Sequence, residues 1–162
     1  MKKYVILLFI IILTLSGCGN KPNENKKVFS PADILSKEDI KDFIDFEPVI
    51  EETETTVSKT LKYKNATLGV SDLVEVTVYS ENDAISKSEI EEKFNFYKTK
   101  NKEYKSIIPM EGVEADCFIA IPSVYILKDG YMVIISAGSG GEDAQINLLC
   151  GLTDIAIKNM NR

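Results

Sequence analysis

The sequence of 162 residues contains no histidine, and this absence excludes several kinds of catalytic and metal site. Histidine is the usual general base beside serine and cysteine nucleophiles, and it often ligates zinc or haem iron. Ser-His-Asp hydrolases, Cys-His enzymes and histidine-ligated metal centres are therefore ruled out. The acidic run at residues 42–54 lacks the Asp-x-Asp-x-Asp-Gly spacing of a calcium loop. The sequence predicts neither a metal site nor a cofactor.

Basic residues are outnumbered by acidic ones in this chain. Nineteen lysines and arginines stand against 25 aspartates and glutamates, so the formal net charge is −6. A protein that binds nucleic acid needs an excess of positive charge to neutralise phosphates, so a nucleic-acid partner is not expected. Hydrophobic residues make up 44% of the chain and charged residues 27%, which is typical of a folded globular domain.

The longest apolar run lies at the N-terminus and is too short to cross a membrane. Residues 4–15 are apolar except for Thr14, whereas a membrane-spanning helix needs about 20 apolar residues. Lys2 and Lys3 precede the run, and small residues follow it. This order is typical of a signal peptide.

The run leads into Leu15-Ser16-Gly17-Cys18, which resembles the lipobox of bacterial lipoproteins. The resemblance implies that the Cys18 thiol receives a diacylglyceryl group and that cleavage before Cys18 removes residues 1–17. It also implies a lipid anchor in the cell membrane, with the domain on the extracytoplasmic face. The alternative is an ordinary secretory signal followed by an unmodified cysteine.

Three segments follow from this interpretation. Residues 1–17 form the signal peptide, residues 18–29 form the lipidated cysteine and a polar tether, and residues 30–162 form a single globular domain. The signal peptide contains two lysines and no acidic residue, so the mature chain carries a net charge of −8. A domain with this charge is expected to stay off an anionic lipid surface on its tether.

The periodicity of residues 30–162 predicts an α+β fold. Ser30, Ser36 and Ser86 are candidate helix caps, the last with Glu89 in a capping box. Alternating residues predict strands, and apolar residues at helical spacing predict helices. The expected elements are a helix or two at 31–45, strands at 54–64 and 73–79, a helix at 87–101, strands at 104–108, 115–121, 124–127 and 131–136, and a helix at 142–160. The order α-β-β-α-β-β-β-α predicts a largely antiparallel sheet of about five or six strands, with two or three helices on one face.

The layout as a whole resembles bacterial surface lipoproteins of unknown function with a PsbP-like α/β fold. The matching features are the lipobox, the tether, an early helix capped by Ser30 and Pro31, the segment Gly112–Ala115 before paired strands, and a closing helix. The resemblance implies a non-catalytic surface protein, and it transfers no site residue except Cys18.

Two further cysteines, Cys117 and Cys150, fall on a predicted strand and on the closing helix. Thiols outside the cytoplasm can pair, so a Cys117–Cys150 disulfide is one interpretation. Two buried free thiols that pack as small hydrophobic side chains are the other.

The segment Ala137–Gly141 places Ser139 between a predicted strand and a predicted helix, the context of a nucleophile elbow. Without histidine the serine has no base to remove its proton. A phosphate at the start of the helix would be repelled by Glu142 and Asp143, which already complement the helix dipole. A simple strand-to-helix turn is therefore expected there.

The function that these features favour is a non-enzymatic binding or adaptor domain at the cell envelope, with an envelope protein as its partner. One alternative is a carboxylate-dependent cell-wall hydrolase, which needs two acidic side chains across a cleft. Another is a carrier of a small apolar ligand. Five aromatic residues are expected to fill the core rather than to line a pocket: Tyr97, Tyr104, Phe118, Tyr125 and Tyr131.

Overall fold

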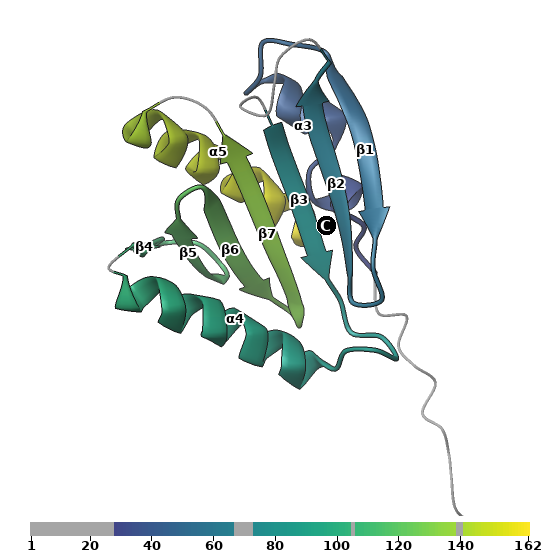
Figure 1. The fold of residues 1–162 in the computed structure, drawn as a ribbon, viewed down its shortest axis with the longest axis vertical. Coiled ribbons are helices and arrows are strands. Elements are labelled where there is room, and N and C mark those ends of the chain that lie inside the picture. The colour runs from purple at the N-terminus through teal and green to yellow at the C-terminus, as the bar shows by residue number, and fades with distance from the viewer. Residues whose placement is uncertain (1–27, 67–72, 105, 139–140) are drawn as a thin grey trace, which may run out of the picture.

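The computed structural model describes residues 28–66, 73–104, 106–138 and 141–162, and it confirms the α+β class (Figure 1). The predicted cysteine anchor at Cys18 and the candidate serine Ser139 lie outside these ranges. The elements in chain order are α2 (Pro31–Ile34), α3 (Lys37–Lys41), β1 (Pro48–Glu54), β2 (Ser58–Asn65), β3 (Leu73–Tyr79), α4 (Lys87–Glu103), β4 (Ile108–Pro109), β5 (Asp116–Ala120), β6 (Ser123–Lys128), β7 (Tyr131–Gly138) and α5 (Glu142–Met160).

The strands form one seven-stranded sheet in the order β1-β2-β3-β7-β6-β5-β4, and every neighbouring pair is antiparallel. This is one strand more than the upper end of the prediction. The added strand is β1, which lies between the predicted helical region at 31–45 and the first predicted strand at 54–64. Six of its seven residues are exposed, so it shows no alternation of apolar and polar residues. β4 contains only two residues and is shorter than predicted.

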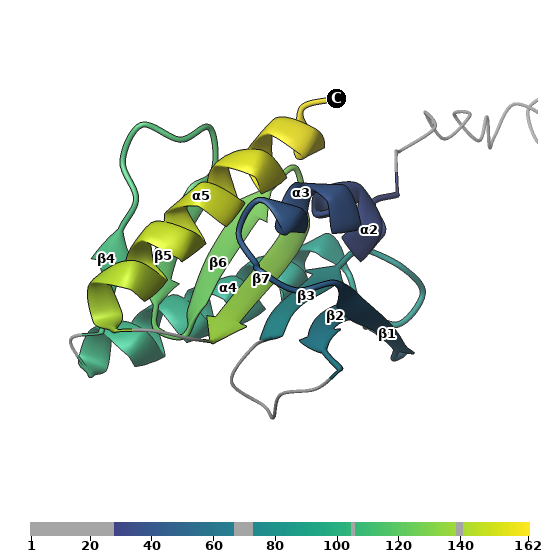
Figure 2. The same ribbon diagram turned by 90° about the horizontal axis from the view of Figure 1, so that it is seen from above.

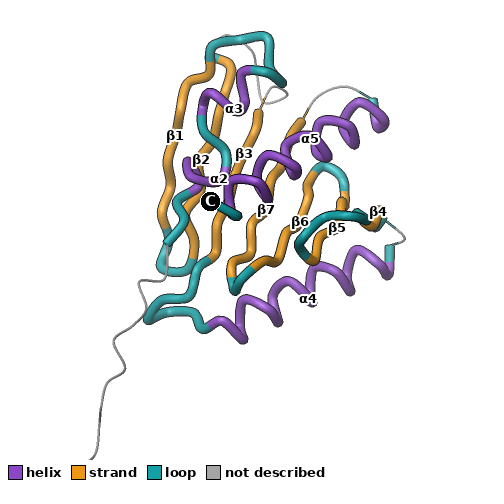
Figure 3. Tube along the Cα trace, turned by 180° about the vertical axis from the view of Figure 1, so that it is seen from behind, coloured by secondary structure: helices purple, strands orange, loops and turns teal. Residues whose placement is uncertain are grey.

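The helices cover both faces of the sheet, which corrects the prediction that they share one face. Figure 2 shows α2, α3 and α5 on one side of the sheet and α4 on the other side. In Figure 3, α2, α3 and α5 lie in front of the sheet. We call these sides the α5 face and the α4 face. The reason lies in β5 and β7, where runs of consecutive buried residues such as Phe118–Ala120 and Tyr131–Val133 place apolar side chains on both faces.

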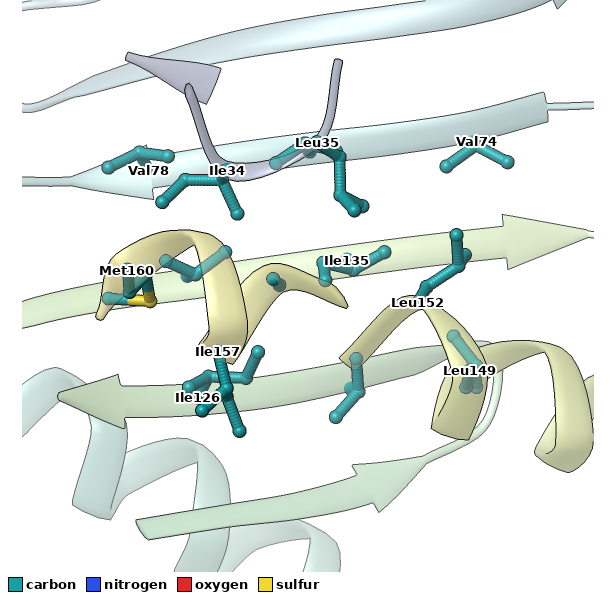
Figure 4. Packing of buried hydrophobic residues seen from close by; sticks show 14 of the residues in the cluster. Ile34, Leu35, Val74, Val78, Ile126, Ile135, Leu149, Leu152, Ile157 and Met160 are labelled. Atoms are coloured by element: carbon teal, nitrogen blue, oxygen red, sulfur yellow. The ribbon is translucent and has the colours of Figure 1, made fainter. Parts of the chain in front are cut away.

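The larger core lies between the α5 face and helices α2, α3 and α5 (Figure 4). Val74, Val76 and Val78 alternate along β3 and point into it, as their spacing predicts. Ile34 and Leu35 reach the same cluster from the end of α2 and are fully buried. The N-terminal helical turns are therefore anchored by the middle of the sheet.

Buried hydrogen bonds hold the N-terminal turns on this core. The Tyr63 hydroxyl donates to the Leu35 carbonyl oxygen at 2.5 Å. The Asn159 amide of α5 donates to the Ile34 carbonyl oxygen at 3.0 Å and to the Asp39 carboxylate at 3.2 Å. These bonds satisfy polar groups that would otherwise be buried without partners.

Three of the helices begin with capping boxes at the predicted serines. Ser30 pairs with Asp33, Ser36 with Asp39, and Ser86 with Glu89. In each, the serine hydroxyl accepts from a backbone N–H while the acidic side chain accepts from the serine N–H. The Ser86 bonds also hold the pKa of Glu89 below its usual value. The α5 helix begins at Gly141 without a side-chain cap.

Candidate functional site

The α4 helix covers only one half of the α4 face. It packs on β6 and β7, and Figure 1 shows it along one end of the sheet, away from β1 and β2. The remaining half presents side chains that no described helix covers. We call this surface the open face. Its side chains are paired across β1, β2 and β3: Glu51, Thr53, Thr60, Lys62, Glu75 and Thr77.

The open face is polar, and its side chains are held in place by one another. The hydroxyl oxygens of Thr60 and Thr77 lie 2.9 Å apart. In the next cross-strand row, the Lys62 ammonium lies 3.1 Å from the Glu75 carboxylate. Cross-strand pairs of this kind stabilise a sheet and order its surface. The open face is thus an ordered surface of hydroxyl and charged groups.

Aromatic side chains border the open face where α4 meets the sheet. The rings of Tyr97 and Tyr125 lie 5.1 Å apart, and Tyr125 stacks on Phe118 at 4.8 Å. The Lys93 ammonium lies 5.3 Å from the ring centre of Tyr79 and 5.8 Å from that of Tyr97. A cation over an aromatic face is attracted by the ring's electron density. We call Tyr79, Lys93, Tyr97 and Tyr125 the tyrosine wall.

Two phenols of the tyrosine wall, those of Tyr79 and Tyr125, have raised pKa values. Burial raises the pKa of Tyr79 and of Tyr125, and the neighbouring Tyr97 phenol raises both further. A phenol with a raised pKa retains its proton at physiological pH, so it can donate a hydrogen bond. The wall therefore presents aromatic ring faces together with the protonated hydroxyl groups of Tyr79 and Tyr125.

The five aromatic residues that were expected in the core have three different environments. Phe118 and Tyr131 are buried, as predicted. Tyr97 and Tyr125 are half-buried in the tyrosine wall. The prediction is wrong for Tyr104, whose side chain is 76% exposed, because it lies just past the end of α4 where nothing packs over it.

Sequence reasoning missed two members of the tyrosine wall. Tyr79 lies on the same side of β3 as Glu75 and Thr77, and no sequence pattern offered a reason to assign it a role. Lys93 precedes Tyr97 by one helical turn, a spacing that puts both on one side of α4. That spacing was the available signal. The contact with Tyr79 depends on how α4 crosses the sheet, which no local pattern encodes.

The acidic residues that the hydrolase alternative requires lie on the surface. Among the described residues, no aspartate or glutamate is buried. Of the acidic run at 42–54, Glu47 contacts Lys37, whose hydrogen bond lowers the pKa of the carboxyl group, and Glu54 lies 3.1 Å from Lys59. No group of three potential ligands is placed to hold a metal ion in the ranges that the structure describes.

Two open hollows bear on the small-ligand alternative. One, of about 380 Å³, is lined by Gly112–Glu114 and by α5 residues that include Asp154 and Lys158. The other, of about 480 Å³, has Lys98 and Lys102 on its wall. Sites for small apolar ligands are enclosed and lined mainly by apolar side chains. The first hollow has charged side chains on its wall, and the second, whose wall also includes Ile107 and Pro109, is open to solvent rather than enclosed, so neither matches such a site.

Cys117 on β5 is buried and Cys150 on α5 is half-buried, and both are free thiols in the structure. Cys150 packs against the core cluster that contains Cys117. The disulfide between them therefore stays a prediction. Burial, followed by the nearby Asp116 and Asp154 carboxylates, raises the pKa of Cys117 to about 11. Burial and Asp154 also raise the pKa of Cys150.

These environments predict unequal thiol reactivity. The thiolate is the reactive form, and with a pKa of about 11 only about a thousandth of Cys117 is ionised at pH 8. Alkylation of the reduced folded protein with iodoacetamide at pH 8 should therefore modify Cys150 at least about tenfold faster than Cys117. Peptide mass spectrometry measures both rates. Equal rates would contradict the burial of Cys117. A parallel sample that is not treated with reductant, and that resists both reactions until it is reduced, would contain the disulfide.

Comparisons with known protein families, with curated proteins and with solved structures found no match. The resemblance to surface lipoproteins with a PsbP-like fold therefore stays a prediction. Each helix in the described ranges is too short or too polar to span a membrane.

Proposed function

We propose that this chain is a lipoprotein anchored by Cys18 on the extracytoplasmic face of the membrane, and that its globular domain binds another protein of the cell envelope. The observation that carries the proposal is the sequence Leu15-Ser16-Gly17-Cys18, which follows two lysines and an apolar run of signal-peptide length. Two or three acyl chains on one residue give a stable anchor, so no membrane-spanning helix is needed.

The binding role is supported by the open face and the tyrosine wall. Tyrosine, which buries a large area at a small entropic cost and keeps a polar end, is enriched in protein interfaces. The tyrosine wall presents three tyrosines beside an ordered row of hydroxyl groups. The hydrolase alternative has no comparable support. It needs two carboxyl groups about 5 Å or about 6.5–9.5 Å apart in a cleft, whereas no aspartate or glutamate among the described residues is buried.

The anchor is tested by replacing its lipid acceptor. The full chain is expressed in a bacterial host that is fed an alkyne-tagged fatty acid, and labelled protein is detected after detergent extraction. The Cys18→Ala variant should lose all label and keep residues 1–17, because no other group near the cleavage point can accept the diacylglyceryl group. Cys117→Ala is the matched control, and it should be labelled and processed like the parent chain. A labelled Cys18→Ala variant cut before residue 18 would contradict the proposal.

A further inference from the structure

The strand β1 leaves one long edge of the sheet free. It is the first strand in the order, and within the described residues its only strand neighbour is β2. The opposite edge is formed by β4, which has only two residues. A free edge presents a row of unpaired backbone N–H and C=O groups, which is a template for a further strand. β1 is seven residues long, so this template is of full strand length.

The register shows which backbone groups point outward from β1. The Thr55 N–H donates to the Ser58 carbonyl oxygen at 2.8 Å across the turn that joins β1 to β2. In an antiparallel pair, hydrogen-bonded and non-hydrogen-bonded residues alternate. Counting back from Thr55 in the observed register, the backbone groups of Ile50, Glu52 and Glu54 point away from β2. These three residues carry the free donors and acceptors of the edge.

The side chains along this edge are acidic, with one exposed apolar residue on each face. Glu51 pairs with Lys64 and Glu54 with Lys59, whereas Glu52 forms no ion pair with any described residue. Val49 is 51% exposed, and Ile50, which points to the opposite face, is 47% exposed. An added strand would cover both apolar side chains and meet the carboxylates directly.

A second copy of this chain fits the edge poorly. Antiparallel pairing of two β1 strands would place glutamates of one copy opposite glutamates of the other, and like charges directly opposite are destabilising. A strand that carries lysine or arginine reverses this effect. Charge complementarity therefore selects a basic partner segment over self-association.

We propose that β1 is the docking edge for an extended segment of a partner protein that carries alternating lysine or arginine residues and adds to the sheet as a further strand. Main-chain hydrogen bonds to Ile50, Glu52 and Glu54 supply the affinity, and the acidic side chains supply the specificity. The inference rests on the binding role proposed above and names the chemistry of its partner. It does not depend on the lipid anchor.

The direct test measures amide hydrogen exchange along β1. The protein is the mature chain from residue 18 onward with Cys18→Ser, and the probe is a capped seven-residue peptide in which lysine alternates with valine. The peptide should slow exchange of the Ile50, Glu52 and Glu54 amides at least about tenfold. The inward amides of Glu51 and Thr53 should already be slow and should change little. If the Ile50, Glu52 and Glu54 amides exchange slowly even without peptide, the edge is already covered by the chain itself or by a second copy. That result would overturn the proposal.

Charge variants test the specificity. Glu52→Lys should weaken peptide binding about tenfold and should improve binding of a glutamate–valine peptide. The matched control is Glu92→Lys, the same change at an exposed glutamate on α4, which should leave both affinities unchanged. Equal binding of the basic and the acidic peptide to the parent chain would overturn the proposal. The peptide-binding tests use the Cys18→Ser variant, which cannot be lipidated, so their outcome is independent of the lipid-labelling test. The docking edge and the lipid anchor can therefore be refuted separately.

Discussion

Replacing Phe94 with alanine is expected to lower the free energy of unfolding by about 3–5 kcal/mol, because the change opens a cavity between α4 and the sheet. The Phe94 side chain is fully buried and meets the Phe118 ring edge-on at 5.4 Å. With Ile90 and Met132 it forms the centre of the smaller core cluster. The surrounding strands cannot collapse into the space, because they are held in register by the sheet. Urea unfolding followed by circular dichroism measures the loss.

The matched control for this prediction lies two residues along the same helix. Phe96 is 57% exposed and contacts mainly the Tyr97 ring and the Lys100 side chain. Phe96→Ala should change the free energy of unfolding by no more than about 1 kcal/mol. Since both changes remove the same side chain from the same helix, helix propensity cancels in the comparison. Equal losses in the two variants would show that α4 is not packed on the sheet through Phe94.

Replacing Asn159 with alanine is expected to lower the free energy of unfolding by about 2–4 kcal/mol, from two lost hydrogen bonds and a buried carbonyl left unsatisfied. The Asn159 amide bonds to the Ile34 carbonyl oxygen and to the Asp39 carboxylate, so it ties α5 to both N-terminal helices. Chemical denaturation measures the stability, and amide exchange in α2 and α3 should accelerate in parallel because these helices lose their contact with α5.

Asn161 provides the control for Asn159. It lies two residues further on, is exposed, and its amide bonds to the exposed Glu114 carboxylate at 3.2 Å. Asn161→Ala should cost less than about 0.5 kcal/mol, as surface substitutions usually do. If Asn159→Ala were equally mild, the N-terminal helices would be held by apolar packing alone.

The parts of the fold that depend on local patterns were predictable. The three serine caps require only an acidic residue three positions later, and α5 spans the predicted residues 142–160. The strand β1 was not predictable, because its exposed residues follow no alternation and it is a strand only through pairing with β2. The side on which α4 packs was missed because an apolar stripe identifies a buried side of a helix but not the surface that covers it.

The candidate site was predictable to a smaller extent. Cys18 follows from a contiguous motif, whereas the open face depends on which half of the sheet α4 leaves uncovered. Lys93 and Tyr79 come from a helix and a strand that meet only in the folded protein. Their contact could not be read from spacing, because spacing describes neighbours within one element. Tyr104 was placed in the core incorrectly because its position just past the end of α4 leaves its side chain exposed.

The hydrogen bond from Asn159 to Ile34 joins residues that are 125 positions apart. Until α5 has been synthesised and docked, Ile34 and Leu35 have no complete cavity to enter, so the first helical turns stay exposed to solvent. Contacts between distant parts of a chain form late and slow the folding rate. The larger core of this domain is therefore complete only when the last helix of the chain has docked on the N-terminal turns.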